Sequence, residues 1–253
     1  IARVSSGRDK GFFRLAGSLV LSLHPMAETL AISVPTVVDA TRGRLTKQTC
    51  DDRLESWATH IVDHLHMTIE VRGRENFEPR ATYLVMSNHQ SHYDVPVLFH
   101  VLGPPHGPSI RMIAKIELFS LPFFGRAMLE AGFIAIDRKS RESAIESLEV
   151  AKQRMRAGVN VWIAPEGTRS PTGELLPFKK GGFHLALDVG EPILPVSIQG
   201  TRLALPRGAS RSQRGADVRV TIHPAIDVSR YDATSKRVAA LMEDVRATIA
   251  SGL

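Results

Sequence analysis

The sequence predicts an α/β domain with a mixed, largely parallel sheet flanked by helices. Short apolar runs alternate along the chain with segments in which apolar residues recur at helical spacing. Strands that alternate with helices are typical of layered α/β structures. The 253 residues, 43% of them hydrophobic, suffice for one full core. The chain contains no internal repeat, so a repeat architecture is not expected.

Residues 1–44 are expected to form an N-terminal amphipathic, membrane-associating helical hairpin ahead of a main domain at residues 45–253. Between Phe12 and Val38 the chain is apolar but interrupted by charged residues, histidine and prolines. Its longest clean piece, residues 15–23, is shorter than the roughly 20 apolar residues that span a bilayer. The pattern predicts two short helices hinged at Pro25 that lie in one leaflet as a monotopic anchor. Four basic residues would face anionic headgroups: Arg3, Arg8, Lys10 and Arg14.

Two other interpretations of this segment stay open. It could be an uncleaved signal-like segment, or an amphipathic helix packed on the domain.

The main domain begins with a helix, for which Asp51 or Asp52 is available as a cap. Its apolar residues recur at helical spacing at Leu54, Trp57, Ile61 and Leu65. Strands are expected at residues 67–71, 83–86, 110–114, 133–136, 159–163, 193–198 and 218–222. The clearest helix between them covers residues 140–157 and is closed by Gly158, and residues 235–250 end the chain as another.

The formal net charge of +6 and a pI near 9.8 indicate an anionic partner. Candidates are an anionic membrane surface, a phosphorylated substrate and nucleic acid. Nucleic acid ranks last, because the chain lacks zinc-finger spacing, an aromatic RNA-binding motif and a long basic run. The single cysteine, Cys50, excludes an intrachain disulfide framework and suits a reducing compartment.

Residues 201–215 are rich in glycine, serine and proline and also carry several arginines. One interpretation is a solvated loop. The other is a basic flap that touches headgroups or an anionic cofactor through Arg202, Arg207, Arg211 and Arg214.

The heptapeptide Asn-His-Gln-Ser-His-Tyr-Asp at residues 88–94 directly follows the apolar run 83–86. His89 would therefore emerge at a strand's end, where the chain turns toward a helix. A neutral imidazole can take a proton from an alcohol near pH 7, and a carboxylate on its other ring nitrogen fixes the tautomer. His89 and Asp94 thus indicate general-base catalysis. A purely structural histidine, or a zinc site that also uses His92, stays open as an alternative.

Three further blocks put cations at or near strand ends, where they can converge on a phosphate. Lys115 follows the strand at 110–114, and Arg138 follows the strand at 133–136. Arg169 belongs to the segment Pro-Glu-Gly-Thr-Arg-Ser at residues 165–170, after the strand at 159–163. Arginine is preferred for forked bonding to phosphate oxygens, and Gly167 lets the backbone approach a ligand closely. Taken singly, each cation is more often a surface charge.

In this order the motifs resemble those of the glycerolipid acyltransferases, most closely the 1-acyl-sn-glycerol-3-phosphate acyltransferases, from residue 71 to residue 198. The resemblance implies that His89 is the general base and that Asp94 holds it. It also implies acceptor-binding roles for Lys115, Arg138, Glu166, Gly167, Thr168 and Arg169. Pro195 and Val196 match a motif of the acyl-chain region. Ala164 departs from the phenylalanine usual in the family, which affects only the packing of that turn.

The activity that the resemblance implies is transfer of a fatty acyl group to the free hydroxyl of lysophosphatidic acid (1-acyl-sn-glycerol 3-phosphate), giving phosphatidic acid. The donor would be acyl-CoA or acyl carrier protein, with no metal and no other cofactor, at the cytoplasmic face of a membrane. Because the chain has no Gly-x-Ser-x-Gly elbow and Cys50 lies outside every motif, direct attack is simpler than an acyl-enzyme.

Three alternatives remain. The acceptor could be glycerol 3-phosphate, another lysophospholipid or a glycolipid. The chain could be a non-catalytic lipid-binding membrane protein, against which the intact His89 and Asp94 pair argues, or a zinc hydrolase.

Overall fold

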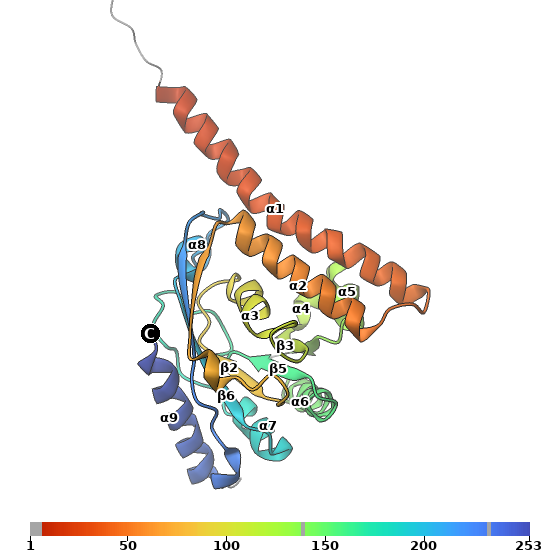
Figure 1. The fold of residues 1–253 in the computed structure, drawn as a ribbon, viewed down its shortest axis with the longest axis vertical. Coiled ribbons are helices and arrows are strands. Elements are labelled where there is room, and N and C mark those ends of the chain that lie inside the picture. Colours follow the sequence, from red (N-terminus) through yellow and green to blue (C-terminus); the bar gives the residue numbers. More distant parts are fainter. Residues whose placement is uncertain (1–6, 138–139, 232–233) are drawn as a thin grey trace, which may run out of the picture.

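A single mixed sheet forms the centre of the molecule (Figure 1). The computed structural model describes residues 7–137, 140–231 and 234–253. Within them, seven strands lie in the order β1-β7-β6-β2-β5-β3-β4. The strands are β1 (Thr68–Arg72), β2 (Leu84–Ser87), β3 (Ile110–Lys115), β4 (Ile134–Ile136), β5 (Asn160–Ile163), β6 (Ile193–Gln199) and β7 (Asp217–Ile222). Every predicted strand is confirmed, because short apolar runs of this kind form buried strands.

Most of the sheet is parallel, as the sequence predicts. β2 pairs in parallel with β5 and β6, and β3 pairs in parallel with β5 and β4. β7 runs antiparallel to β6 and carries β1 beside it in parallel. The carboxyl ends of β6, β2, β5, β3 and β4 therefore meet at one edge of the sheet, where α/β proteins usually bind their ligands.

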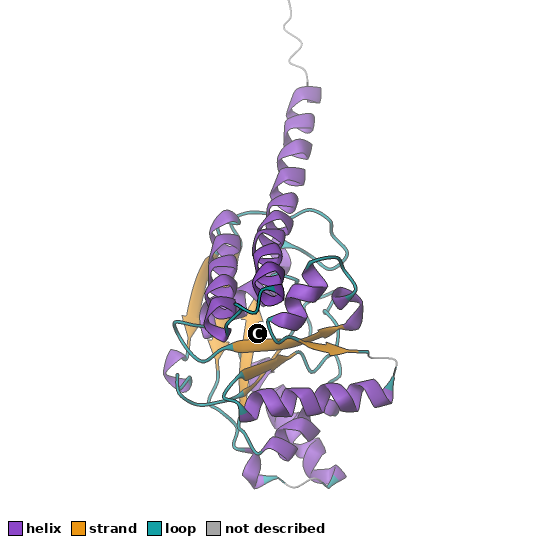
Figure 2. Ribbon diagram, turned by 90° about the vertical axis from the view of Figure 1, so that its right-hand side faces the viewer, coloured by secondary structure: helices purple, strands orange, loops and turns teal. Residues whose placement is uncertain are grey.

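Helices cover both faces of the sheet (Figures 1 and 2). On one face lie α2 (Lys47–His64) and α3 (Asp94–Leu102), and on the other lie α6 (Arg141–Arg156), α7 (Gly181–Val189) and α9 (Ser235–Ser251). The shorter helices are α4 (Ile116–Phe119), α5 (Phe124–Glu130), α8 (Thr201–Ala204), and the 3₁₀ helices η1 (Arg74–Asn76) and η2 (Val228–Arg230). Along β2, Val85 belongs to the apolar core on the side of α2 and α3, whereas Leu84 and Met86 belong to the core on the side of α6, α7 and α9. The alternation of a strand's side chains thus divides the apolar residues between two cores.

The three predicted helices of the main domain are present, but one begins earlier than expected. α6 and α9 match the predicted ranges closely, and Ser140 caps α6 by accepting a hydrogen bond from the Ser143 amide. For α2, neither Asp51 nor Asp52 is the cap. The helix starts after Thr46, whose hydroxyl accepts from the Thr49 amide at 3.1 Å. This threonine supplies a cap one turn before the aspartates.

The N-terminal segment is one helix, α1 (Gly7–Thr41), with Pro25 and Pro35 inside it. The prediction of two short helices hinged at Pro25 is therefore wrong. Contacts along the neighbouring helix hold α1 together beyond the proline: the Trp57 indole donates to Thr29 Oγ1 at 3.0 Å, and Arg53 donates to Thr36 Oγ1 at 3.1 Å. Tertiary packing thereby offsets the backbone hydrogen bond that a proline removes. The hairpin consists instead of α1 and α2, and α1 also packs on α5.

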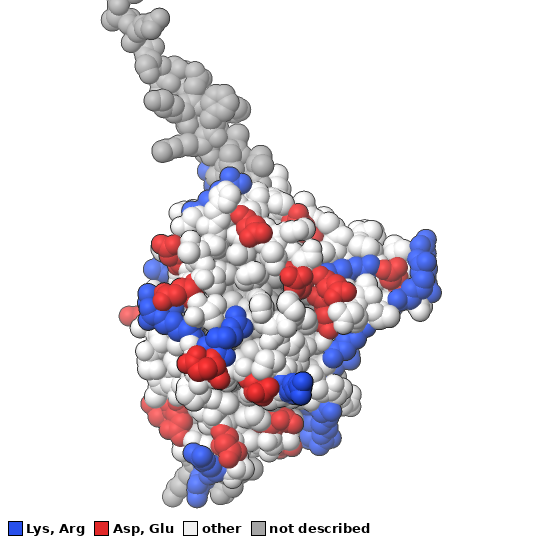
Figure 3. Space-filling model, in the orientation of Figure 1, with Lys and Arg blue, Asp and Glu red and all other residues white. Residues whose placement is uncertain are grey.

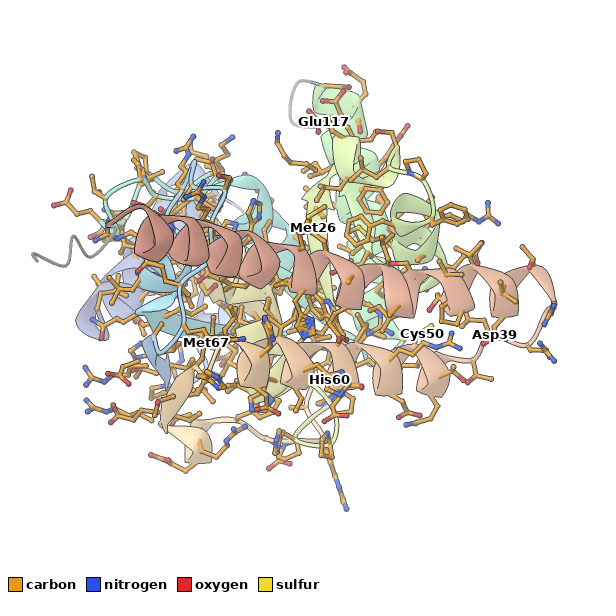
Figure 4. The ribbon with its side chains drawn as sticks, turned by 90° about the horizontal axis from the view of Figure 1, so that it is seen from above. Met26, Asp39, Cys50, His60, Met67 and Glu117 are labelled. Carbon is orange, nitrogen blue, oxygen red and sulfur yellow. The ribbon has the colours of Figure 1, made fainter. Side chains whose placement is uncertain are left out.

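The exposed surface of α1 is apolar between residues 23 and 38. Every exposed residue in this stretch is aliphatic or methionine, and we call the set the apolar face of α1: Leu23, Met26, Ala27, Leu30, Ala31, Val34 and Val38. Figure 4 looks down on α1 and labels Met26 on it, with His60 on the neighbouring α2. Lys and Arg side chains gather at the tip of the hairpin (Figure 3), whose turn carries Arg42, Arg44 and Lys47. Among the described residues, no helix is long and apolar enough to span a membrane.

Gly200 joins β6 to α8, and a substitution there tests whether this connection requires glycine. Its φ is 91°, and a Cβ at this position would lie 1.9 Å from the carbonyl oxygen of Asp217. Gly200→Ala should lower the free energy of unfolding by more than the about 1–2 kcal/mol that the left-handed conformation alone costs. Gly208→Ala is the control, because its φ is 84° and no atom would approach the new Cβ within 4 Å. Equal losses for the two variants in denaturant unfolding would contradict the clash.

Candidate active site

The site lies at the carboxyl edge of the parallel strands, around the segment that links β2 to α3. His89 stands two residues after β2, and Asp94 is the first residue of α3. The expected position of the histidine, at a strand's end before a helix, is confirmed. The strands on both sides of β2 supply the neighbouring segments: the turn after β5 and α8 after β6.

His89 and Asp94 are in direct contact. The Nδ1 atom of His89 lies 2.7 Å from Oδ2 of Asp94, whose side chain is fully buried. The amides of Gln90 and Ser91 donate to the same oxygen, and Thr201 Oγ1 donates to Oδ1 at 2.5 Å. An ionised carboxylate can accept at every one of these positions, and its hydrogen bond to Nδ1 assigns the proton of a neutral imidazole to that nitrogen. The Nε2 atom of His89 is then the basic nitrogen.

The backbone of His89 is held on both sides by the turn after β5. Its amide donates to Glu166 Oε1 at 2.8 Å, and its carbonyl accepts from the Ser170 amide at 2.7 Å. The second carboxylate oxygen of Glu166 accepts from the Leu176 amide at 2.8 Å. Burial raises the pKa of Glu166, although both backbone hydrogen bonds favour its charged form. Since backbone amides engage both oxygens, Glu166 contributes to the site through the position of His89.

Asn88 and Thr201 are two functional residues that sequence reasoning missed. The buried Asn88 amide donates to the Ile198 carbonyl and accepts from the Ile198 amide, each at 2.8 Å, so it fastens the end of β2 to β6. Thr201 fixes the second oxygen of Asp94 from the same strand's end. The position of Asn88 immediately before His89 was a usable signal, whereas Thr201 lies more than 100 residues away in sequence and gave none.

The turn of residues 165–170 has the conformation that its glycine predicts. Gly167 has a φ of 69°, and a Cβ there would lie 2.9 Å from Cε of Lys179. Its amide donates to the carbonyl of Ala164 at 2.9 Å, so the turn closes with alanine where the family usually has phenylalanine. Thr168 is exposed, and Arg169 is partly buried. Burial and the charge of Arg207 lower the pKa of Arg169, while Asp94 acts in the opposite direction.

Of the two predicted cations that the structure describes, Lys115 and Arg169, only Arg169 lies near the catalytic pair. Arg169 lies within electrostatic reach of Asp94 and His92. Lys115 ends β3, two strands away from β2 in the sheet and so about 10 Å across it. Its ammonium is half exposed and lies 3.8 Å from Glu117. Arg138 lies outside the described residues.

The remaining predicted positions are in or beside the same edge. Pro195 and Val196 lie in β6 and are buried, with Val196 in the core beneath α3. His92 is exposed, but desolvation of its ring, together with the charges of Arg169 and His89, lowers its pKa to about 4. Within the described ranges, no three histidine, cysteine or acidic residues are arranged to hold a metal ion, and the zinc alternative gains no geometric support.

The comparisons with known proteins agree on one family. The family model described as Acyltransferase matches residues 68–199. A 1-acyl-sn-glycerol-3-phosphate acyltransferase of Chlamydomonas reinhardtii is 30% identical over 94% of this chain and 68% of its own length. The chloroplastic 1-acyl-sn-glycerol-3-phosphate acyltransferase BAT2 of Brassica napus is 34% identical over 70% of this chain and 50% of its own.

A solved structure agrees with these relatives. The crystal structure of the 1-acyl-sn-glycerophosphate (LPA) acyltransferase PlsC from Thermotoga maritima matches with a TM-score of 0.75 and 26% identity. The match covers 94% of this chain and 97% of that one. The chain spans about half the length of several curated relatives that it matches.

The low pKa of His92 predicts how the free energy of unfolding depends on pH. An unfolded histidine binds a proton near pH 6.5, whereas folded His92 does so only near pH 4. The unfolded state therefore binds more protons between these values, and stability falls as the pH falls through this window. His92→Gln removes this contribution, so the loss of unfolding free energy between pH 7 and pH 5 should be smaller in the variant. Urea unfolding at both pH values measures the difference, and an unchanged loss would refute the assignment.

Proposed function

The chain belongs to the Acyltransferase family, and from that premise we propose that it acylates the free hydroxyl of 1-acyl-sn-glycerol 3-phosphate to give phosphatidic acid. The observation that carries the proposal is the contact between His89 Nδ1 and the buried carboxylate of Asp94 at 2.7 Å. The names of the relatives support lysophosphatidic acid as the acceptor. The donor is an acyl thioester of coenzyme A or of acyl carrier protein, and the enzyme requires no other cofactor.

In the proposed reaction, Nε2 of His89 takes the proton of the acceptor hydroxyl as its oxygen attacks the thioester carbonyl. Asp94 stabilises the imidazolium that forms and keeps the ring in orientation. When the tetrahedral intermediate collapses, the carbon–sulfur bond breaks and the imidazolium returns the proton to the leaving thiolate. Glu166 acts as a positioning residue, because it holds the amide of His89 and touches no reacting atom.

Four backbone amides around the start of α3 already have acceptors within the protein. The amides of Gln90 and Ser91 donate to Asp94, the Tyr93 amide donates to Ser91 Oγ, and the Asp94 amide donates to the Ser91 carbonyl. The oxyanion donors of the reaction therefore lie outside this set.

Arg169 is the proposed first ligand of the acceptor phosphate, because it lies beside the catalytic pair and forms no ion pair in the part of the chain that the structure describes. Lys115 is proposed to extend the positive field along the same edge of the sheet, and Arg138, which lies outside the described residues, is proposed as a further acceptor ligand. Product analysis with lysophosphatidic acid, glycerol 3-phosphate and lysophosphatidylcholine, each with both donor types, tests this function. Acylation of another acceptor in preference to lysophosphatidic acid would overturn it.

The apolar face of α1 supports attachment to one face of a membrane, and we assign the cytoplasmic face. A lipid acceptor with a long chain stays in the bilayer, since each buried methylene contributes about 0.8 kcal/mol. An exposed helix surface without a single charged residue is stabilised when lipid covers it. Exposed apolar side chains also lie on α5, which packs on α1, and on the segment just before it, at Ile116, Leu121, Phe123 and Leu129.

The general base is tested by His89→Ala, which should lower kcat by roughly 10²–10⁴-fold and leave the thermal midpoint nearly unchanged. Asp94→Asn should also be severe, because an amide no longer selects the required tautomer. His106→Ala is the control, an exposed histidine in the loop before β3. A His92→Ala variant as inactive as His89→Ala, in protein that carries stoichiometric zinc, would favour a metal mechanism instead.

The membrane surface is tested by the double change Met26→Glu and Leu30→Glu. Burying one such side chain in lipid contributes about 1.5–3 kcal/mol, and 1.4 kcal/mol is a factor of ten, so vesicle binding should weaken more than about tenfold. The control adds the same two charges on the far side of the molecule, by Ala239→Glu and Ala240→Glu in α9. Co-sedimentation with vesicles of mixed anionic and zwitterionic lipid gives the measurement. Unchanged binding of the α1 variant would move the membrane surface elsewhere.

A further inference from the structure

Residues 201–215, which the sequence leaves open as a solvated loop or a basic flap, are fastened to the catalytic segment. The Ser91 hydroxyl donates to the Leu205 carbonyl at 2.9 Å, and the hydroxyls of Tyr93 and Ser212 lie 2.5 Å apart. Together with the contact of Thr201 to Asp94, these bonds join both ends of the stretch to the segment that carries His89. The backbone of the stretch is therefore held beside the catalytic segment, although Arg207, Arg211 and Arg214 are exposed.

Arg207 reaches across to the turn that carries Arg169. Its Nη1 atom donates to the carbonyl oxygen of Arg169 at 2.8 Å. The guanidinium of Arg207 thus lies against the backbone of Arg169, although the two residues are 38 positions apart in sequence. The charge of Arg207 also lowers the pKa of Arg169, which reflects repulsion between the two cations.

Neither guanidinium is neutralised by a carboxylate. Over residues 7–137, 140–231 and 234–253, the ion pairs include neither Arg169 nor Arg207. Asp94 is the acidic group whose charge reaches Arg169, but its oxygens already accept from His89, Gln90, Ser91 and Thr201. Two like charges held together without a counterion are costly, and an anionic ligand between them would remove that cost.

A third cation, Lys179, lies against the same turn. The side chain of Lys179 occupies the space that a Cβ on Gly167 would need, with Nζ 3.1 Å from that position. The Lys179 amide donates to the Pro165 carbonyl at 2.8 Å, so the backbone fixes this neighbour as well. The turn is therefore contacted by Lys179 at Gly167 and by Arg207 at Arg169.

We propose that Arg207 is the second guanidinium of the acceptor-phosphate site and makes that site select a phosphate monoester over a phosphodiester. The inference rests on the proposed function, because it takes the phosphate of lysophosphatidic acid as the ligand of Arg169. A monoester carries about −1.5 to −2 charges near neutral pH, whereas a diester carries about −1. Arg169 by itself supplies one positive charge, which matches the charge of a diester. A second fixed guanidinium is balanced only by the additional charge of the monoester.

The test compares lysophosphatidic acid with its methyl phosphodiester, which has the same acyl chain and the same free hydroxyl but one ionisable group fewer. Arg207→Gln removes the charge and keeps an N–H group that can donate to the Arg169 carbonyl. We expect kcat/KM for the monoester to fall about 10- to 100-fold, since a charge-assisted hydrogen bond is lost, and kcat/KM for the diester to fall less than about threefold. Arg207→Lys should restore part of the monoester preference, because it keeps the charge without the forked geometry.

Arg211→Gln is the matched control, since this exposed arginine lies on the same stretch and forms no hydrogen bond with residues 165–173 in the described structure. It should leave both acceptors unchanged. Calorimetric binding of the two lipids, in detergent and without donor, gives the same comparison independently of turnover. The affinity of the wild-type protein for the monoester should exceed its affinity for the diester, and Arg207→Gln should remove most of that preference.

Equal losses for both lipids in Arg207→Gln would mean that Arg207 only supports the turn, and an unchanged preference would mean that it does not contact the phosphate. Either result overturns the inference while acylation by the wild-type protein leaves the proposed function standing. Conversely, a wild-type protein that binds the monoester selectively through Arg207 but acylates neither lipid would overturn the proposed function alone.

Discussion

The rest of the site depends on the hydrogen bonds that the buried carboxylate of Asp94 accepts. An ionised carboxylate removed from water is unfavourable unless hydrogen bonds replace its hydration. Here the replacements come from a side chain and two amides of the segment after β2 and from a hydroxyl at the end of β6. The pairing of β2 with β6 must therefore be correct before the carboxylate is satisfied, so the fold of the sheet and the geometry of the base form together.

β5, the strand on the other side of β2, also helps to fix the site. Glu166 follows β5 and holds the amide of His89, and Ser170 holds its carbonyl. Both backbone polar groups of His89 thus bind one turn, while its side chain binds Asp94. A histidine fixed at three points loses little further freedom when substrate arrives, which favours catalysis by orientation. The arrangement is unfavourable for the charged form of Glu166, because burial raises its pKa.

Local pattern was enough to predict the seven strands and the positions of α6 and α9, because short apolar runs and a capping serine act within a few residues. The same holds for the catalytic pair, whose two members lie five residues apart. What could not be predicted depends on distant partners. The continuity of α1 through Pro25 requires Trp57 and Arg53 of α2, and the fixation of Asp94 requires Thr201. Arg207 gave no signal for the same reason, since its contact with Arg169 exists only once residues 201–215 have docked.

The double attachment of His89 to the turn after β5 has a consequence for attempts to change what this scaffold accepts. Loop exchange assumes that each loop of an α/β protein can be replaced without affecting the rest of the fold. Here the backbone of His89 forms two hydrogen bonds with residues 165–170, one to the Glu166 side chain at 2.8 Å and one from the Ser170 amide at 2.7 Å, so neither segment can be exchanged by itself. A transplanted turn without a carboxylate at position 166 would leave the His89 amide buried and unpaired. Recombination between relatives therefore preserves the position of the base only when the incoming turn also carries a carboxylate at position 166.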